Sequence, residues 1–205
     1  MTESSPTPTV WLREVATGEL RPAILCDSIQ SRHLADVDHI WKPALTILLK
    51  LSGQRHSEET SHWNWRAKMR QVRRNRQQRS FAIEYSGVTQ GLMIVDLSRR
   101  CRVPPDVGQG MVYVDYVEVA PWNRPAWTPH RQFKSIGSNF LGLAVDLSFR
   151  LGFSGRIGLH SLPQADSFYR QMGLTDVELD ANYGNLRYFE LTALDARTSR
   201  LRELP

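Results

Sequence analysis

The stretch Met111–Ala120 reads MVYVDYVEVA and is followed by Pro121. It is rich in β-branched and aromatic residues, which is typical of a strand, and the proline ends it. Beyond it, Ile136–Leu151 repeats apolar residues at helical spacing, and Arg156–His160 again has the pattern of a short strand. A strand, a helix and a second strand in this order predict an α/β fold with one mixed sheet and helices on both faces.

The segments on either side extend this sheet. Before it we expect a hairpin of Thr9–Val15 with Glu19–Cys26, and another of Phe81–Tyr85 with Gln90–Leu97. Between the hairpins we expect a helix over Leu34–Leu51, interrupted at Pro43, and a second helix from Ser57 to about Gln78. After it we expect a helix over Pro163–Met172 and strands over Thr175–Leu179 and Leu186–Thr192. Residues 1–10 are expected to be a disordered tail, and residues 11–205 a single domain.

Composition narrows the class of protein. The chain has 205 residues, of which 41% are hydrophobic, and contains no apolar run long enough to cross a membrane. Its two cysteines, Cys26 and Cys101, are too far apart in the sequence for a compact zinc motif and give no sign of a disulfide framework. We therefore expect no metal centre, no membrane association and a cytoplasmic location.

Three short motifs follow one another in a fixed order. They are Val117-Glu118-Val119-Ala120-Pro121, Gln132-Phe133-Lys134-Ser135-Ile136-Gly137 and Phe168-Tyr169-Arg170-Gln171-Met172-Gly173-Leu174. Together they resemble the GNAT family (GCN5-related N-acetyltransferases) over about residues 81–192. The resemblance implies a single-domain GNAT-like fold, in which the strands at 111–120 and 156–160 diverge to form a V-shaped cleft for acetyl-CoA.

The resemblance also implies where acetyl-CoA binds. The start of a helix offers free backbone N–H groups and a positive dipole end to the pyrophosphate. The implied cofactor-binding residues are Val117, Val119, Gln132, Lys134, Ser135, Ile136, Gly137 and Ser138. The chain departs from the family at Ser135, where the family usually has Gly. It also departs by an insertion of about eight residues within 122–131, whose Arg124, His130 and Arg131 are further candidate phosphate ligands.

Catalysis in the family is direct attack of an amine on the thioester. The resemblance assigns to Tyr169 the donation of a proton to the departing thiolate, although Leu162 stands where the family often has Asn. We expect a β-bulge near Val117–Val119 to offer a backbone N–H to the oxyanion.

The general base stays open among Asp115, Glu118 and His160, with Glu84 and Asp96 as more distant alternatives. By strand alternation Asp115 shares a face with Val117 and Val119, whereas Glu118 points the other way unless the bulge resets it.

A run of seven basic residues lies between Arg66 and Arg79 with no acid among them. It predicts a solvated helix face, a site for an acidic acceptor, or a nucleic-acid surface, of which the last is possible but not favoured. The function expected overall is acetyl-CoA-dependent N-acetylation of an unidentified amine, on a small molecule or a protein, by a monomer or homodimer. The alternatives are an inactive GNAT-like module that binds acyl-CoA or a partner, and a nucleic-acid-associated protein.

Overall fold

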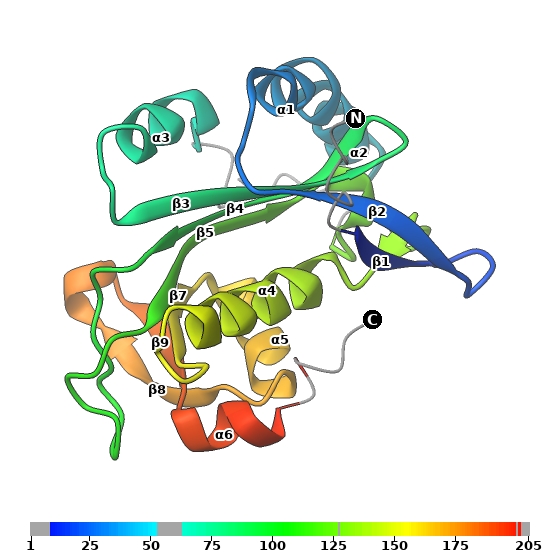
Figure 1. Cartoon of the computed structure of the whole chain (residues 1–205). Helices are drawn as coiled ribbons and strands as arrows, with labels where there is room; N and C mark the ends of the chain where they lie inside the picture. Colours follow the sequence, from blue (N-terminus) through cyan, green and yellow to red (C-terminus); the bar gives the residue numbers. More distant parts are fainter. Residues whose placement is uncertain (1–8, 53–62, 127, 200, 202–205) are drawn as a thin grey trace, which may run out of the picture.

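A nine-stranded mixed sheet forms the centre of the molecule (Figure 1). The computed structural model describes residues 9–52, 63–126, 128–199 and 201. The strands lie in the order β6-β1-β2-β3-β4-β5-β7-β9-β8. Their bounds are β1 (Thr9–Glu14), β2 (Leu20–Cys26), β3 (Gln78–Tyr85), β4 (Val88–Asp96), β5 (Val112–Val119), β6 (Phe133–Lys134), β7 (Ile157–Ser161), β8 (Thr175–Asp180) and β9 (Leu186–Leu191). Neighbouring strands are antiparallel except β5 and β7, which pair in parallel.

Helices cover both faces of this sheet, which confirms the expected architecture (Figure 1). One face carries α1 (Ser31–Asp36), the π-helical turn η1 (Val37–Trp41), α2 (Lys42–Ser52) and α3 (Trp65–Val72). The other face carries α4 (Ile136–Arg150), α5 (Asp166–Gln171) and α6 (Ala193–Thr198). Short 3₁₀ turns lie at η2 (Pro121–Asn123), η3 (Pro163–Ala165) and η4 (Ala181–Tyr183). Each face has its own buried cluster, so the sheet separates two apolar layers.

The α4 layer is the larger of the two. Phe140, Leu141, Ala144 and Val145 of α4 are all buried against the sheet. The helix approaches β4 so closely that a Cβ atom on Gly91 would lie 2.6 Å from the ring of Phe140. A glycine at this position therefore allows α4 to pack on the strand that neighbours β5.

Pro43 changes the type of helix without ending it. The N–H of Lys42 bonds to the carbonyl of Val37, five residues earlier, so a widened turn precedes the proline. Because proline has no N–H and crowds the preceding turn, this wider turn lets the helix continue. The predicted interruption at Pro43 is therefore only a change of helix type, from η1 to α2.

The helix predicted over Ser57–Gln78 is much shorter in the structure. Residues 53–62 lie outside the described ranges, and α3 begins at Trp65, where the Asn64 side chain accepts a hydrogen bond from the N–H of Ala67. It ends at Val72, and β3 begins at Gln78. The basic run is therefore divided among helix, turn and strand, and it does not form one helical face.

Three smaller differences concern the ends of the chain and the inserted loop. Thr9 and Val10, which fall within both the predicted tail and the predicted strand Thr9–Val15, belong to β1, while residues 1–8 are outside the described ranges. The short strand β6 and the helix α6 were not predicted. The described part of the chain has no helix with the length and apolar character needed to cross a membrane.

Candidate active site

The site is built where β5 and β7 part. Their pairing covers Val112–Val114 against Ile157–Leu159, after which β5 continues along β4 as far as Val119. A cavity of about 590 Å³ lies at this divergence. Its lining comes from β5, β7 and the segments around them, and includes residues 113–119, Trp63, Arg124, Leu159, His160, Leu162, Gln164, Ala165, Tyr169, Tyr183, Gly184 and Leu186. The predicted V-shaped cleft is confirmed.

A β-bulge lies at the mouth of this divergence. Val95 of β4 pairs with Val114, whereas Ile94 pairs with Tyr116, so Asp115 is the extra residue on β5. A bulge was expected near Val117–Val119, and the structure has it just N-terminal to that segment.

The bulge resets which side chains share a face. Val117 and Val119 pack in the α4 layer, whereas Tyr116 packs in the α1–α3 layer. The Asp115 carboxylate accepts a hydrogen bond from Gln78 Nε2 at 3.3 Å and faces the ammonium of Lys68 on α3. The prediction that Asp115 shares a face with Val117 and Val119 was wrong, because simple alternation fails across a bulge.

Backbone N–H groups of β5 point into the cleft. The N–H of Ala120 donates to the carbonyl of Gln90 on β4 at 2.9 Å. Since N–H directions alternate along a strand, those of Val117 and Val119 point away from β4, toward the gap that β7 has left. They are placed to donate to a ligand in the cavity.

We call Trp63, Lys68, Asp115, Tyr116 and Glu118 the cleft cluster. The Lys68 Nζ atom lies 3.1 Å from the centroid of the Tyr116 ring and 4.8 Å from that of Trp63. Burial lowers the pKa of Lys68 to about 8, although the charges of Asp115 and Glu118 oppose this shift. Burial, together with the nearby charge of Asp96, raises the pKa of Asp115. The cluster thus holds a lysine and a carboxyl group whose pKa values are shifted toward neutrality.

Glu118 is also on the α3 side and is firmly held. It accepts a hydrogen bond from Trp65 Nε1, and its Oε1 atom lies 2.6 Å from the Arg124 guanidinium. Arg124 also donates to the carbonyl of Val119, and burial lowers its pKa to about 10. The role of Arg124 as a phosphate ligand stays a prediction, and in this structure its guanidinium pairs with Glu118 at the cavity.

Tyr169 lines the same cavity from α5. Its side chain is buried between Phe168 and Phe189, with ring centroids 5.2 and 5.7 Å away. No hydrogen bond joins its hydroxyl to another of the described residues. Burial, with a contribution from Asp166, raises the pKa of Tyr169, so its phenol keeps its proton at neutral pH. Leu162, where the GNAT family often has Asn, lines the cavity as well.

The first turn of α4 flanks this region. The first helical bond runs from the N–H of Asn139 to the carbonyl of Ser135 at 2.8 Å, so the N–H groups of Ile136, Gly137 and Ser138 have no acceptor within the helix. A Cβ atom on Gly137 would lie 3.3 Å from the ring of Phe168, next to Tyr169. Gly137 therefore brings α4 close to α5, and a side chain at 137 would meet Phe168.

Ser135, where the GNAT family usually has Gly, lies in the loop before α4. Its backbone is left-handed, with φ of +76°, a conformation that favours glycine. Gln132 and Lys134 have exposed side chains, while Phe133 between them is buried and β6 pairs with β1. Cofactor binding by Gln132, Lys134 and Ser135 stays a prediction, as it does for Val117, Val119 and residues 136–138.

His160 lines the cavity, but both of its ring nitrogens are occupied. Nδ1 lies 2.6 Å from the Tyr113 hydroxyl, and Nε2 lies 3.1 Å from Asp180. Its ring stacks on Tyr183, with centroids 3.9 Å apart. This arrangement makes His160 a support for the cavity wall and a poor candidate for the general base.

The two distant alternatives, Glu84 and Asp96, are not among the residues that line the cavity. Asp96 accepts two hydrogen bonds from Ser98, which closes the turn after β4.

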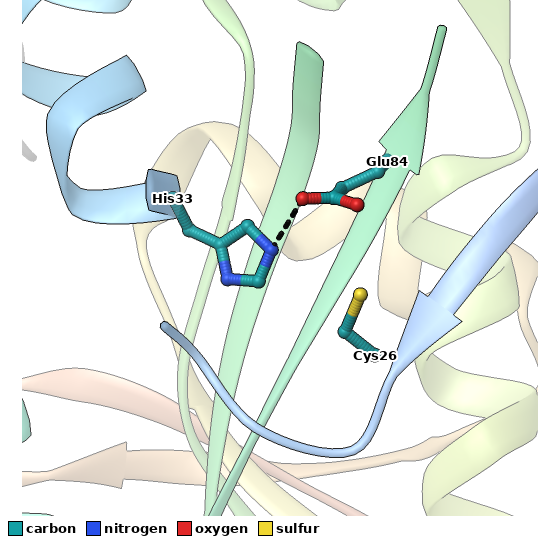
Figure 2. A group of neighbouring side chains, drawn as sticks. All are labelled: Cys26, His33 and Glu84. Carbon is teal, nitrogen blue, oxygen red and sulfur yellow. Dashed lines mark hydrogen bonds and ion pairs between the residues drawn. The ribbon is translucent and has the colours of Figure 1, made fainter. Parts of the chain in front are cut away.

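Glu84 belongs to a second group, which we call the Glu84 cluster: Cys26 of β2, Arg32 and His33 of α1, and Glu84 of β3. Figure 2 shows three of these side chains, Cys26, His33 and Glu84. Three potential metal ligands, Cys26, His33 and Glu84, lie close enough to share an ion.

The bonds within the Glu84 cluster favour an ion-pair network over a metal site. His33 Nδ1 accepts from the N–H of Gln30 at 2.8 Å, so the ring proton is on Nε2, which donates to Glu84 at 2.6 Å. A proton thus occupies the nitrogen that would bind the metal. The Arg32 guanidinium also lies 2.6 Å from Glu84 and would repel a cation.

Solved structures share this fold. No protein-family model matches the sequence, and no curated protein is significantly similar to it. An acetyltransferase of the GNAT family from Listeria monocytogenes superimposes with a TM-score of 0.53 at 13% identity, over 83% of this chain and 94% of that one. The PaiA N-acetyltransferase of Thermoplasma acidophilum, solved in complex with coenzyme A, also gives 0.53 at 13%, over 83% and 98%. FeeM, an N-acyl amino acid synthase from uncultured soil microbes, gives 0.54 at 10%, over 86% and 95%. The chain therefore has the GNAT fold.

Proposed function

We propose that this protein transfers an acyl group, most simply acetyl, from a coenzyme A thioester to an amine in the cavity between β5 and β7. The observation that carries the proposal is the bulge at Asp115 beside the point where β5 and β7 separate. Around this cavity lie the backbone N–H groups of β5, the phenol of Tyr169 and the carboxylates of Asp115 and Glu118. The GNAT fold of the chain supports the same reaction class, since an N-acetyltransferase with this fold was solved with coenzyme A.

On the α4 side, the thioester substrate meets backbone donors. The N–H groups of residues 136–138 suit a pyrophosphate, because they are unpaired within the helix and lie at the positive end of its dipole. The N–H groups of Val117 and Val119 suit the pantetheine arm and the negative charge that develops on the thioester oxygen during attack.

On the α3 side, the amine meets charged and aromatic groups. Asp115 is our candidate general base, because burial raises its pKa and so strengthens its carboxylate as a proton acceptor. Glu118, fixed by Arg124, adds negative charge that attracts a cationic amine. Tyr169 holds a proton at the cavity and is placed to deliver it to the thiolate that leaves.

The test combines cofactor binding with turnover. Acetyl-CoA binding is measured by calorimetry, and release of the free thiol is followed over a panel of small primary amines. We expect binding, and thiol release that depends on an added amine. Ser138→Asp should weaken acetyl-CoA binding about 10-fold or more, because a carboxylate in the first turn repels phosphate while it suits the helix dipole.

The matched control is Thr198→Asp, which adds the same charge on α6. We expect this control to bind acetyl-CoA as the wild type does. Absence of binding at millimolar acetyl-CoA would overturn the proposal. Binding without thiol release for any amine would favour the alternative of an inactive acyl-CoA-binding module.

A further inference from the structure

Lys68 is the one basic side chain of α3 that lies inside the cleft cluster. Arg66 on the same helix turns outward to Asp38 at 2.7 Å, and Arg70 is exposed. The ammonium of Lys68 instead lies over the Tyr116 ring, beside Trp63, and both rings line the cavity. A flexible four-carbon chain thus holds a primary amine against two rings that line the cavity in which we place the thioester.

The surroundings of Lys68 favour its neutral form. The charged groups that face it are Asp115 and Glu118, both of β5, and they only partly offset its burial. With a pKa of about 8, roughly one Lys68 side chain in ten is neutral at pH 7, about 200-fold more than for an ordinary lysine. Only the neutral amine has the lone pair that attacks a thioester, so this lysine is activated as a nucleophile.

We infer that Lys68 is itself an acceptor and that the protein acetylates this side chain from acetyl-CoA. The inference rests on the proposed function. The Nζ atom forms a bond to the acetyl carbonyl carbon, and the bond from that carbon to sulfur breaks. The proton lost from Nζ passes by way of Asp115, and the thiolate leaves as free coenzyme A once it is protonated.

Self-acetylation changes the cleft cluster. The product is a neutral amide, so the cation over the Tyr116 ring disappears, and the carboxylates of Asp115 and Glu118 each lose one positive neighbour. The local charge of the cavity becomes more negative by one unit. A cationic acceptor would then compete with no internal cation for this position.

The small number of lysines in the sequence makes the modified residue easy to assign. The chain contains four lysines, and the other three, Lys42, Lys50 and Lys134, are exposed. The wild-type protein is incubated with acetyl-CoA and no other amine, and each lysine is then examined by peptide mass spectrometry. We expect acetyl groups to accumulate at Lys68 ahead of the other three, at a rate per molecule that does not depend on protein concentration.

Two variants and one unfolded sample are the controls. Lys68→Arg keeps the charge and should lose the modification, whereas Lys42→Arg, on the exposed pair with Asp38, should leave it unchanged. Protein unfolded in urea reports uncatalysed acetylation and should lose the preference for Lys68. The rate at Lys68 should rise with pH and level off above about 8, as the neutral amine becomes the main form.

The possible outcomes separate this inference from the proposed function. A folded protein that acetylates added amines but leaves Lys68 no more modified than the exposed lysines would overturn the inference and leave the function standing. A protein that does not bind acetyl-CoA would overturn both. Selective, concentration-independent modification of Lys68 would support both.

Discussion

The Glu84 cluster and the cleft cluster lie in the same layer of the molecule and use similar side chains, but they differ in how completely those side chains are paired. Glu84 is held by Arg32 and His33 and does not line the cavity. Asp115, by contrast, faces a cavity and has a raised pKa. A closed network of this kind contributes to stability, whereas charges with shifted pKa values beside a cavity are typical of a reaction site. The comparison predicts that changes in the Glu84 cluster affect folding and that changes in the cleft cluster affect turnover.

The largest effect is expected for Asp115→Asn. Loss of a general base lowers kcat by about 10³-fold, while acetyl-CoA affinity and the melting temperature change little. The wild-type rate should rise with pH through the raised pKa of Asp115, because only the carboxylate accepts a proton, and the variant should lack this rise. Steady-state kinetics from acidic to alkaline pH check both points, with the exposed Asp146→Asn as control. A variant with the wild-type pH profile would remove Asp115 from the mechanism.

Glu84→Gln should have the next largest effect, on stability. Replacing a buried carboxylate that faces Arg32 and His33 lowers the free energy of unfolding by about 3 kcal/mol, measured by urea denaturation. Thiol release by the folded fraction should stay near that of the wild type. Glu14→Gln, in a surface pair with Arg21 at 2.8 Å, is the control and should change stability much less.

The pH dependence of stability is a second test of the ion pairs in the Glu84 cluster. Burial alone would raise the pKa of Glu84, but Arg32 and His33 outweigh burial and lower it. Its contribution to stability is therefore present above the pKa of the unfolded chain and is lost as the pH falls through the lowered pKa. Glu84→Gln should lack this part of the acid dependence. An unchanged acid profile would show that the cluster does not hold an ionised carboxylate.

Tyr169→Phe tests the role of the phenol as a proton donor and should lower kcat about 10²-fold. The ring stays packed against Phe168 and Phe189, so the fold and acetyl-CoA affinity should persist while kcat falls. Tyr85→Phe, on a ring that packs against Phe133, is the matched control. If thiol release by Tyr169→Phe equals that of the wild type, the phenol is a packing residue and the proton comes from elsewhere.

Sequence reasoning reached the fold because the strands around the cleft have strong local patterns. Met111–Ala120, Ile136–Leu151 and Arg156–His160 each carry their own periodicity, and the structure has β5, α4 and β7 there. The bulge at Asp115 could not be found in this way, since alternation assumes a regular strand. The bulge depends on how β5 pairs with β4.

Sequence reasoning named Asp115 and Glu118 of the cleft cluster, but it missed the part played by Lys68 for a related reason. Lys68 looked like one of seven charges on a helix, because its ring contacts come from Tyr116 on β5 and Trp63 just before α3. Contacts between residues so far apart in the sequence depend on the packing of α3 on the sheet. The one feature of the sequence that points to such contacts is that Trp, Arg and Lys residues are interspersed in this segment.

The smallest effect is expected for the exposed remainder of the basic run. Arg73, Arg74 and Arg76 lie in the turn between α3 and β3 and are exposed. Reversing all three to Glu should change acetyl-CoA affinity and kcat less than about twofold, because exposed charges that do not line the cavity are screened by salt. Binding of the wild type to RNA or DNA, with a steep salt dependence that this triple variant abolishes, would instead support a nucleic-acid role.

A crystal structure with a non-hydrolysable acetyl-CoA analogue tests the central claim most directly, that the cleft beside the bulge is the site of acyl transfer. We expect the pyrophosphate on the N–H groups of residues 136–138. The acyl end should lie between the N–H of Val117 and the hydroxyl of Tyr169, with Asp115 and Lys68 on the amine side. An analogue bound elsewhere, or with its acyl end turned away from the cleft cluster, would contradict the account.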